Sequence, residues 1–283
     1  MKFYRHIALH SVIAYFLLAG ASLNCRCADT DQTALEISDE FIRDVASSSP
    51  RLGDMFTLLK IGGRFLDGIP FHINAVDKIF KSTPLQLATE IRHTQAIKTL
   101  LACGADINTQ DDDGLTAISY ALIQNNPRIV QFLIDNGADM NIKNKLGNSS
   151  LHHAILQKNV AYVKFILQYQ PDIGQEHGPN NLTPLHLAVL PNIPSDISFQ
   201  ITKLLVDHGA DVDAKDSLGR APIMLALDAR KIEVVKLLAQ SGANISIKDP
   251  KQDKTLIQVA AQDKNNKDLV RFLAETLVKQ QKR

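Results

Sequence analysis

A short segment recurs six times along this chain at a nearly constant spacing, and this recurrence constrains the fold more than any other feature. Its copies read TPLQLA, TAISYA, SSLHHA, TPLHLA, APIMLA and TLIQVA, and successive copies lie 33, 33, 34, 38 and 34 residues apart. They begin at Thr83, Thr116, Ser149, Thr183, Ala221 and Thr255. A repeat of this period builds a stacked array, because one unit cannot bury its apolar face alone.

A second segment follows the first by 20 residues in four units and by 25 residues in the unit that starts at Thr183. Its copies read CGADIN, NGADMN, YQPDIG, HGADVD and SGANIS. Glycine in this segment suits the left-handed backbone that ends a helix, and Thr or Ser opening the first segment suits a hydroxyl cap at a helix start. Each unit is therefore predicted to be helix, turn, helix and an outstretched hairpin-like loop, which makes the fold all-α.

These two segments, in phase over five units, resemble the ankyrin repeat. The resemblance implies an all-α ankyrin-repeat solenoid whose concave face binds a partner protein. It also implies that the His of the TPLHLA segment is a structural hydrogen-bonding residue. His152 and His186 occupy that place, while Gln86 and Gln258 replace the histidine in two other units.

The repeats also divide the chain. Residues 41–63 carry the same offsets in degenerate form, so we expect 41–82 to be an N-terminal capping repeat followed by a long loop. Residues 83–277 hold six units, and the last is polar, which suits a C-terminal cap. A polar tail is expected at 278–283.

Two departures from the repeat interrupt the pattern. Gln170-Pro171 replaces the Gly-Ala pair, so the helix cap there must differ. The unit that starts at Thr183 carries five extra residues, 191–195. Its Pro191-x-x-Pro194 pattern leaves two interpretations open, a plain loop insertion or a motif for a proline-binding groove.

The N-terminus has the order of a secretory signal peptide. Lys2 and Arg5 precede a mostly apolar run at 7–18, and small residues follow at 19–22. The run is shorter than the roughly 18 residues of a membrane span. We expect a signal peptide at 1–28, a flexible lead-in at 29–40 and a secreted or periplasmic protein. Cys25 leaves a lipid anchor open, and membrane contact is expected only through such an anchor or an uncleaved leader.

No motif in the chain carries a recognisable chemistry. Adjacent His152 and His153 lack the i, i+3 or i+4 spacing of helical metal ligands, and the run 111–113 lacks the distal Glu of a calcium loop. With 31 basic and 30 acidic residues, the net charge of +1 argues against a nucleic-acid partner. We therefore expect no catalytic residue, cofactor or metal, and a monomeric scaffold for a protein partner. The alternatives are an envelope-tethered, lipoprotein-like structural protein and an enzyme with its site in residues 29–80.

The resemblance also implies where a partner would bind, namely just before the first segment of each unit and just after its helix. These positions are Ile79, Phe80, Ser82, Glu90, Ile91, Asp112, Asp113, Leu115, Gln124, Lys145, Leu146, Asn148, Gln157, Asn180, Leu182, Ser217, Leu218, Arg220 and Asp228. An apolar residue stands one or three positions before the first segment in five consecutive units, at Phe80, Leu115, Leu146, Leu182 and Leu218. Such a stripe either meets a partner or packs between neighbouring loops, and the sequence leaves both interpretations open.

Overall fold

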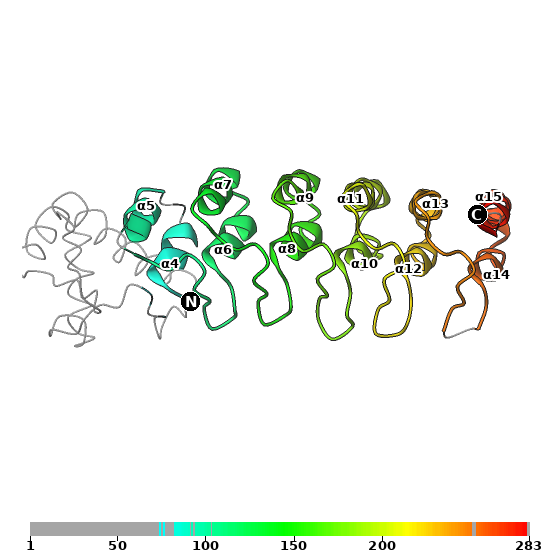
Figure 1. Cartoon of the computed structure of the whole chain (residues 1–283), viewed down its shortest axis with the longest axis horizontal. Coiled ribbons are helices and arrows are strands. Elements are labelled where there is room, and N and C mark those ends of the chain that lie inside the picture. The colour runs from blue at the N-terminus through cyan, green and yellow to red at the C-terminus, as the bar shows by residue number, and fades with distance from the viewer. Residues whose placement is uncertain are drawn as a thin grey trace, which may run out of the picture. The chain divides into compact units, whose positions relative to one another are not determined.

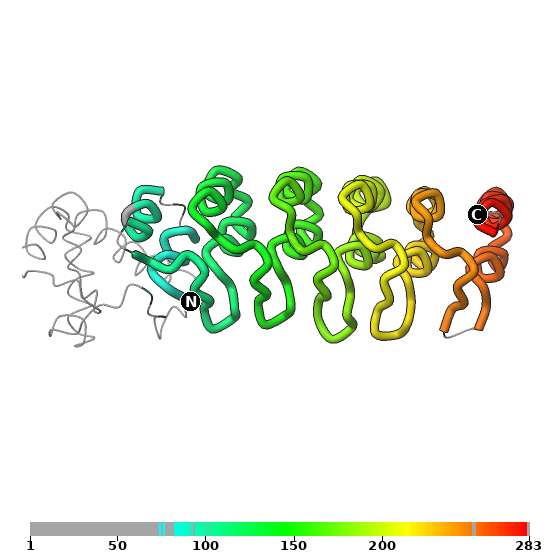
Figure 2. The backbone as a smooth tube through the Cα atoms, viewed as in Figure 1, coloured from blue at the N-terminus to red at the C-terminus, as the bar shows by residue number. Residues whose placement is uncertain are grey.

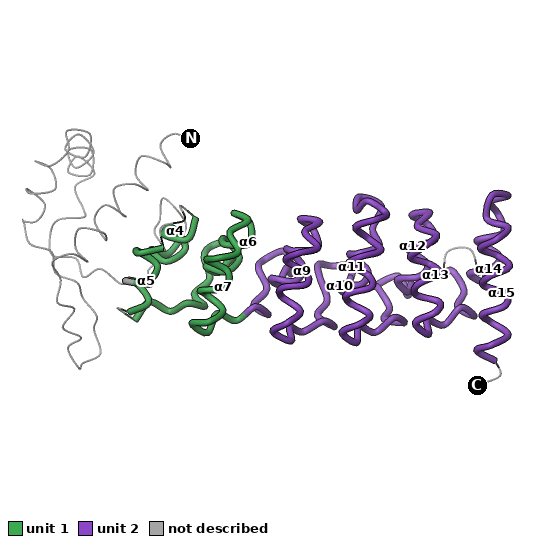
Figure 3. The backbone as a smooth tube through the Cα atoms, turned by 90° about the horizontal axis from the view of Figure 1, so that it is seen from above, with its two compact units in different colours: residues 1–139 green, residues 140–283 purple. Residues whose placement is uncertain are grey.

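A computed structural model describes most of the repeat region. The described residues are 74, 76, 82–90, 92, 94–102, 104–250 and 253–281. The expected signal peptide, the lead-in, Cys25 and nearly all of the capping repeat and its loop lie outside the described residues. Two compact parts, divided between Asp139 and Met140, are considered separately (Figure 3).

The first part contains two helix pairs. The pairs are α4 (Pro84–Glu90) with α5 (Thr94–Ala102), and α6 (Ala117–Ile123) with α7 (Pro127–Asp135). The first helices α4 and α6 pack against each other, and each packs against its own second helix.

The second part contains four further helix pairs. They are α8 (Ser150–Leu156) with α9 (Val160–Leu167), α10 (Pro184–Ala188) with α11 (Ser195–Asp207), α12 (Pro222–Asp228) with α13 (Ile232–Gln240), and α14 (Leu256–Ala260) with α15 (Lys267–Gln281). The short 3-10 helix η1 (Lys264–Asn266) precedes α15. Helices α8, α10 and α12 form one row, and α9, α11, α13 and α15 form a second row beside it (Figure 1). Hairpin-like loops extend from the helical layers on one side (Figure 2).

Local capping marks the start of several first helices. The Thr183 side chain accepts from the His186 N–H while the His186 ring accepts from the Thr183 N–H, and Ser149 with His152 forms the same reciprocal cap. Thr255 and Gln258 close the equivalent cap of α14. Second helices begin differently, since the Asn126 side chain accepts from the Ile129 N–H at the start of α7.

The core lies along the contact between the helix rows. One alanine per unit is buried where the first helices pack, at Ala88, Ala121, Ala154, Ala188, Ala226 and Ala260. A methyl group leaves room for neighbouring helices to approach closely, and the larger second-helix side chains Leu133, Ile166 and Leu205 fill the space beside it. The expected all-α stack of helix pairs is confirmed within each described part.

Most residues of the expected polar tail at 278–283 belong to the last helix. Helix α15 continues to Gln281. Its Gln280 side chain donates to the Ala243 carbonyl at 2.9 Å, which holds the last turn against the preceding repeat. Among the described residues, no helix combines the length and apolar character needed to cross a membrane.

Candidate functional site

Three of the described hairpin-like loops are held by a carboxylate or amide side chain at the start of the turn. Asn144 Oδ1 accepts from the N–H groups of Leu146 and Asn148, at 3.0 and 2.9 Å. Asp216 Oδ1 accepts in the same way from Leu218 and Arg220, at 2.9 and 2.8 Å. Such a side chain holds the turn through bonds to residues two and four positions ahead. The leucine at the tip is therefore held in a defined position.

Asp111 holds the equivalent turn in the first part of the chain. Its Oδ1 accepts from the N–H groups of Asp113 and Leu115, at 2.9 and 2.7 Å. His177 replaces this side chain in the loop 175–182, and a bridge between His177 and Leu182 closes that loop instead. The His177 Nδ1 atom is buried and has no hydrogen-bond partner among the described residues.

Burial differs along the apolar stripe. Leu146 is 69% exposed and Leu218 is 49% exposed, whereas Leu115 and Leu182 are half-buried. Phe80 lies outside the described residues. Exposure of a large apolar side chain on a rigid turn is typical of a surface that meets another protein. Of the stripe, Leu146 and Leu218 fit that description best.

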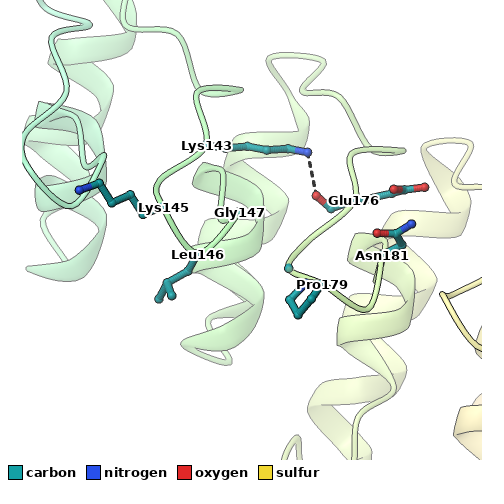
Figure 4. A pocket seen from close by; sticks show the side chains of 8 residues that line it. Lys143, Lys145, Leu146, Gly147, Glu176, Pro179 and Asn181 are labelled. Carbon is teal, nitrogen blue, oxygen red and sulfur yellow. Dashed lines mark hydrogen bonds between the residues drawn. The ribbon is translucent and has the colours of Figure 1, made fainter.

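A hollow of about 450 Å³ lies between the loops 142–149 and 175–182 (Figure 4). Its lining comprises Lys143, Lys145, Leu146, Gly147, Glu176, Gly178, Pro179 and Asn181. Leu146 and Pro179 project from the tips of the two loops, and Lys143 Nζ donates to the Glu176 carbonyl at 2.7 Å across them (Figure 4). The hollow thus combines two apolar tips with lysine side chains.

Two glycines bring these loops together. A Cβ atom on Gly147 would lie 2.8 Å from the Gly178 backbone nitrogen, closer than real Cβ contacts come. Both residues also have left-handed backbones, with φ of +80° at Gly147 and +61° at Gly178. Only glycine allows this approach without strain or displacement of the backbone. Gly147 and Gly178 therefore set the width of the hollow.

The histidines near the hollow have structural roles. His152 is fully buried, its ring lies 5.6 Å from that of His177, and its Nε2 is 3.0 Å from the Gln175 carbonyl. Burial lowers the pKa of His152 to about 4, and the adjacent His177 lowers it too. Burial also lowers the pKa values of His153 and His186. Within the described parts of the chain, no three His, Cys, Asp or Glu side chains form a cluster that could hold a metal ion.

The expected contact residues that the structure describes are exposed, half-buried or buried. The exposed ones are Asp112, Asp113, Lys145, Leu146, Gln157, Asn180, Ser217, Leu218 and Asp228. The half-buried ones are Glu90, Leu115, Gln124, Leu182 and Arg220. Ile79, Phe80 and Ile91 lie outside the described residues.

The remaining two, Ser82 and Asn148, are a correction to the expected contact surface. Ser82 is 3% exposed, and its hydroxyl lies 3.1 Å from the Tyr120 hydroxyl. Asn148 is 5% exposed at the base of its loop, where its backbone closes the turn on Asn144. A partner cannot reach side chains so deeply covered.

Arg220 is held by its own loop. Its guanidinium pairs with the Asp216 carboxylate at 2.8 Å. Burial raises the pKa of that carboxyl, but the hydrogen bonds from Arg220 and Leu218 and the positive charge of Arg220 together outweigh it. The pKa of Asp216 therefore lies below its usual range. The charge of Arg220 is balanced within the loop before any partner arrives.

Six residues that line the hollow are absent from the expected set, namely Lys143, Gly147, Glu176, Gly178, Pro179 and Asn181. All six lie in the loops between repeats rather than at the positions that the resemblance singles out. Gly178-Pro179 in an extended loop is a turn signal that could have drawn attention to this place.

Comparison with known proteins decides the family. A family model described as ankyrin repeats in three copies matches residues 46–144, 85–177, 123–216 and 151–249. The chain belongs to the ankyrin-repeat family. The solved ankyrin repeat domain of Bcl-3, a member of the IkappaB family, superimposes with a TM-score of 0.62 at 25% identity, over 81% of this chain and 96% of that one.

Curated ankyrin-repeat relatives match shorter parts. A putative ankyrin repeat protein of Rickettsia bellii is 31% identical over 178 residues, which are 60% of this chain and 41% of the relative. Protein fem-1 homolog C of Xenopus laevis is 36% identical over 75 residues, 24% of this chain and 12% of that protein. Mouse ankyrin repeat and SOCS box protein 6 is 34% identical over 121 residues, 42% of this chain and 25% of that protein. The chain thus spans less than half the length of each of these relatives.

Proposed function

We propose that this ankyrin-repeat chain is a non-catalytic scaffold that binds a partner protein through its loop tips and the adjoining first helices. Ankyrin repeats are protein-interaction modules, which supports the class of function. The exposed residues of the expected contact set lie on these loops and at the ends of the first helices. They mix apolar, acidic and basic side chains, as the surface of a protein interface does.

The observation that carries the proposal is the exposed Leu146 beside the hollow. Its side chain is 69% exposed on a turn fixed by Asn144, next to Pro179. A rigid apolar anchor loses little conformational entropy on binding, so it contributes more affinity than a mobile one. An apolar side chain of the partner would fill the hollow between Leu146 and Pro179.

The charges around the hollow favour a particular neighbour for that apolar side chain. The Lys143 ammonium is engaged with the Glu176 carbonyl, whereas Lys145 is exposed at the tip. An acidic group on the partner beside its apolar anchor would meet Lys145. Complementary charge at the rim of an interface mainly speeds association and selects partners.

A photo-crosslinking residue at position 146 tests this proposal, with the same residue at position 278 as the control. Val278 is 51% exposed on α15, so it matches Leu146 in exposure but lies in another repeat. We expect a partner to crosslink at 146 and not at 278, and Leu146→Ser to abolish capture while Val278→Ser preserves it. Equal crosslinking at both positions would contradict a specific site at the loop tips.

We also propose that the protein is exported, on the basis of the basic, apolar and small segments at its N-terminus. The mass of the mature protein tests this directly. A mature chain that starts near residue 22 or 28 supports cleavage of a signal peptide, whereas a mass raised by lipid on Cys25 indicates an anchor. An intact N-terminus on a protein that stays inside the producing cell would contradict export.

A further inference from the structure

Within each described part, hydrogen bonds join successive repeats at the base of their loops. In three of the bonds, a side-chain oxygen at the last position of one GADxN-type segment accepts from a backbone N–H in the next segment, and in the fourth Asn74, which precedes the first such segment, supplies the oxygen. The pairs are Asn74 with Asp106 at 2.8 Å, Asn108 with Asp139 at 2.8 Å, Asn141 with Asp172 at 2.9 Å and Asp213 with Asn244 at 2.8 Å. We call these four bonds the rungs.

One rung is missing in the middle of the second part. The segment YQPDIG ends in Gly174 where the others end in Asn, Asp or Ser, so it supplies no side-chain acceptor. The corresponding donor is the Asp211 N–H, and no acceptor among the described residues pairs with it. The missing rung would therefore join the repeat of α8 and α9 to the repeat of α10 and α11.

A hollow of about 300 Å³ occupies the place of the missing side chain. It is lined by Ile173, Gly174, Glu176, Thr183, Ala210, Asp211, Ala214 and Lys215. The volume stands at the lower end of the range for ligand sites, which is roughly 300–1,000 Å³. It suits one side chain of a bound protein better than a larger ligand.

The backbone does not require glycine at position 174. Gly174 lacks the left-handed φ of the cap glycines, and a Cβ atom there would meet only Asp172 Oδ1, at an ordinary 3.6 Å. Asparagine would therefore fit at this position as it does at 108 and 141. Neither the backbone conformation nor the Cβ surroundings therefore account for the absence of a side chain at this position.

We propose that the hollow at Gly174 receives an asparagine or glutamine side chain of the partner protein. The carboxamide oxygen would accept from the Asp211 N–H, as the Asn108 and Asn141 oxygens accept from their own donors. The aliphatic part of the side chain would lie against Ile173, Ala210 and Ala214. The inference rests on the proposed scaffold function and adds a second, polar anchor to it.

The rim charges favour a neutral carboxamide over a carboxylate. Glu176 and Asp211 bring two negative charges to the lining, and Lys215 brings one positive charge. A carboxylate would meet net repulsion, whereas the amide NH₂ group can donate to either acidic side chain. Asp211 Oδ1 already accepts from the Asp213 N–H at 2.9 Å, which leaves Oδ2 for this role.

Gly174→Asn is the variant that tests the inference, because it supplies the missing acceptor from the chain itself. Amide hydrogen exchange of Asp211 should slow about tenfold in the variant if the rung forms. Ser246→Asn is the matched control, since Ser246 holds the same place in the last segment and lines neither hollow. Unchanged exchange at Asp211 would overturn the geometry on which the proposal depends.

Random peptides displayed on phage are the binding probe, selected on the full wild-type chain. We expect peptides that bind wild type and Ser246→Asn but lose at least tenfold affinity for Gly174→Asn, and these should share one Asn or Gln. Replacing that residue by Ala should produce the same loss. Enrichment of Asp, Glu or an apolar residue at that position would overturn the proposal.

The same selection separates this inference from the scaffold proposal. Peptides that lose binding to Leu146→Ser but bind Gly174→Asn normally would support the scaffold and overturn the carboxamide site. Peptides sensitive to Gly174→Asn alone would support the carboxamide site and contradict the role of Leu146. A selection that yields no binder sensitive to either variant would overturn both.

Discussion

His152 Nε2 lies 3.0 Å from the Gln175 carbonyl, and Nδ1 of the same ring lies 3.2 Å from the Ser149 N–H. Nε2 must donate to the carbonyl, and Nδ1 must accept from the N–H. Only a neutral ring with its proton on Nε2 satisfies both. One uncharged imidazole therefore caps α8 and ties that helix to the following loop.

Acidification should destabilise the second part of the chain. The folded pKa of His152 is about 4, against 6.5 for a free histidine, and burial lowers the pKa values of His153, His177 and His186 as well. The unfolded chain therefore binds protons first as pH falls, so stability is complete above 6.5 and is lost towards pH 4. His152 alone should cost about 2 kcal/mol of unfolding free energy near pH 5.

Urea unfolding between about pH 7.5 and pH 5 measures this effect. His152→Gln is the control, because Gln258 forms the same capping box with Thr255 without titrating. The pH slope should be shallower in the variant. An identical slope in both proteins would show that His152 does not carry the effect.

Lys231 should destabilise the fold near neutral pH. It is 3% exposed, its ammonium donates to the Leu190 carbonyl at 2.6 Å, and burial lowers its pKa from 10.5 to about 8. The folded chain thus releases the proton before the unfolded chain, and stability rises between pH 8 and 10.5. Lys231→Met should raise the unfolding free energy at neutral pH by about 1–2 kcal/mol. In the variant, the melting temperature should not rise between pH 8 and 10.5. A rise that persists there would show that Lys231 does not cause it.

Gln170 carries backbone strain that glycine would relieve. It holds the left-handed φ of +51° at the place where other units have glycine. Gln170→Gly should therefore stabilise the protein by about 1 kcal/mol. Gln168→Gly is the matched control, because Gln168 has a right-handed helical backbone. This substitution should lower the unfolding free energy by about 0.5–1 kcal/mol. Equal effects of the two substitutions in urea unfolding would argue against strain at Gln170.

The contact between Gly147 and Gly178 should be sensitive to a single methyl group. Gly147→Ala places a Cβ 2.8 Å from the Gly178 nitrogen, whereas a Cβ on Gly209, which has a similar φ of +89°, meets nothing within 4 Å. Gly209→Ala should cost about 1 kcal/mol from backbone strain alone, and Gly147→Ala about 2 kcal/mol or more. Comparable losses in melting temperature would show that the two loops separate freely.

Local chemistry made the helix pairs predictable from the sequence. The caps Thr183–His186 and Thr255–Gln258 form between residues three positions apart, so their geometry depends little on the rest of the chain. The same holds for Asp216, which shapes its loop through neighbours two and four residues ahead. The last turn of helix α15 is different, because Gln280 donates to the Ala243 carbonyl in another repeat, a contact that the local sequence does not reveal.

The sequence by itself determined the repeat, its caps and its turns, because these depend on residues close together in the chain. Only the tertiary structure decided which loop residues face outward, leaving Leu146 exposed and covering Asn148 two residues further on. It also placed Gly174 opposite Asp211, where a missing side chain leaves a hollow. Exposure and complementarity depend on groups that stacking brings together from 30 or more residues apart, as in the rung from Asn141 to Asp172.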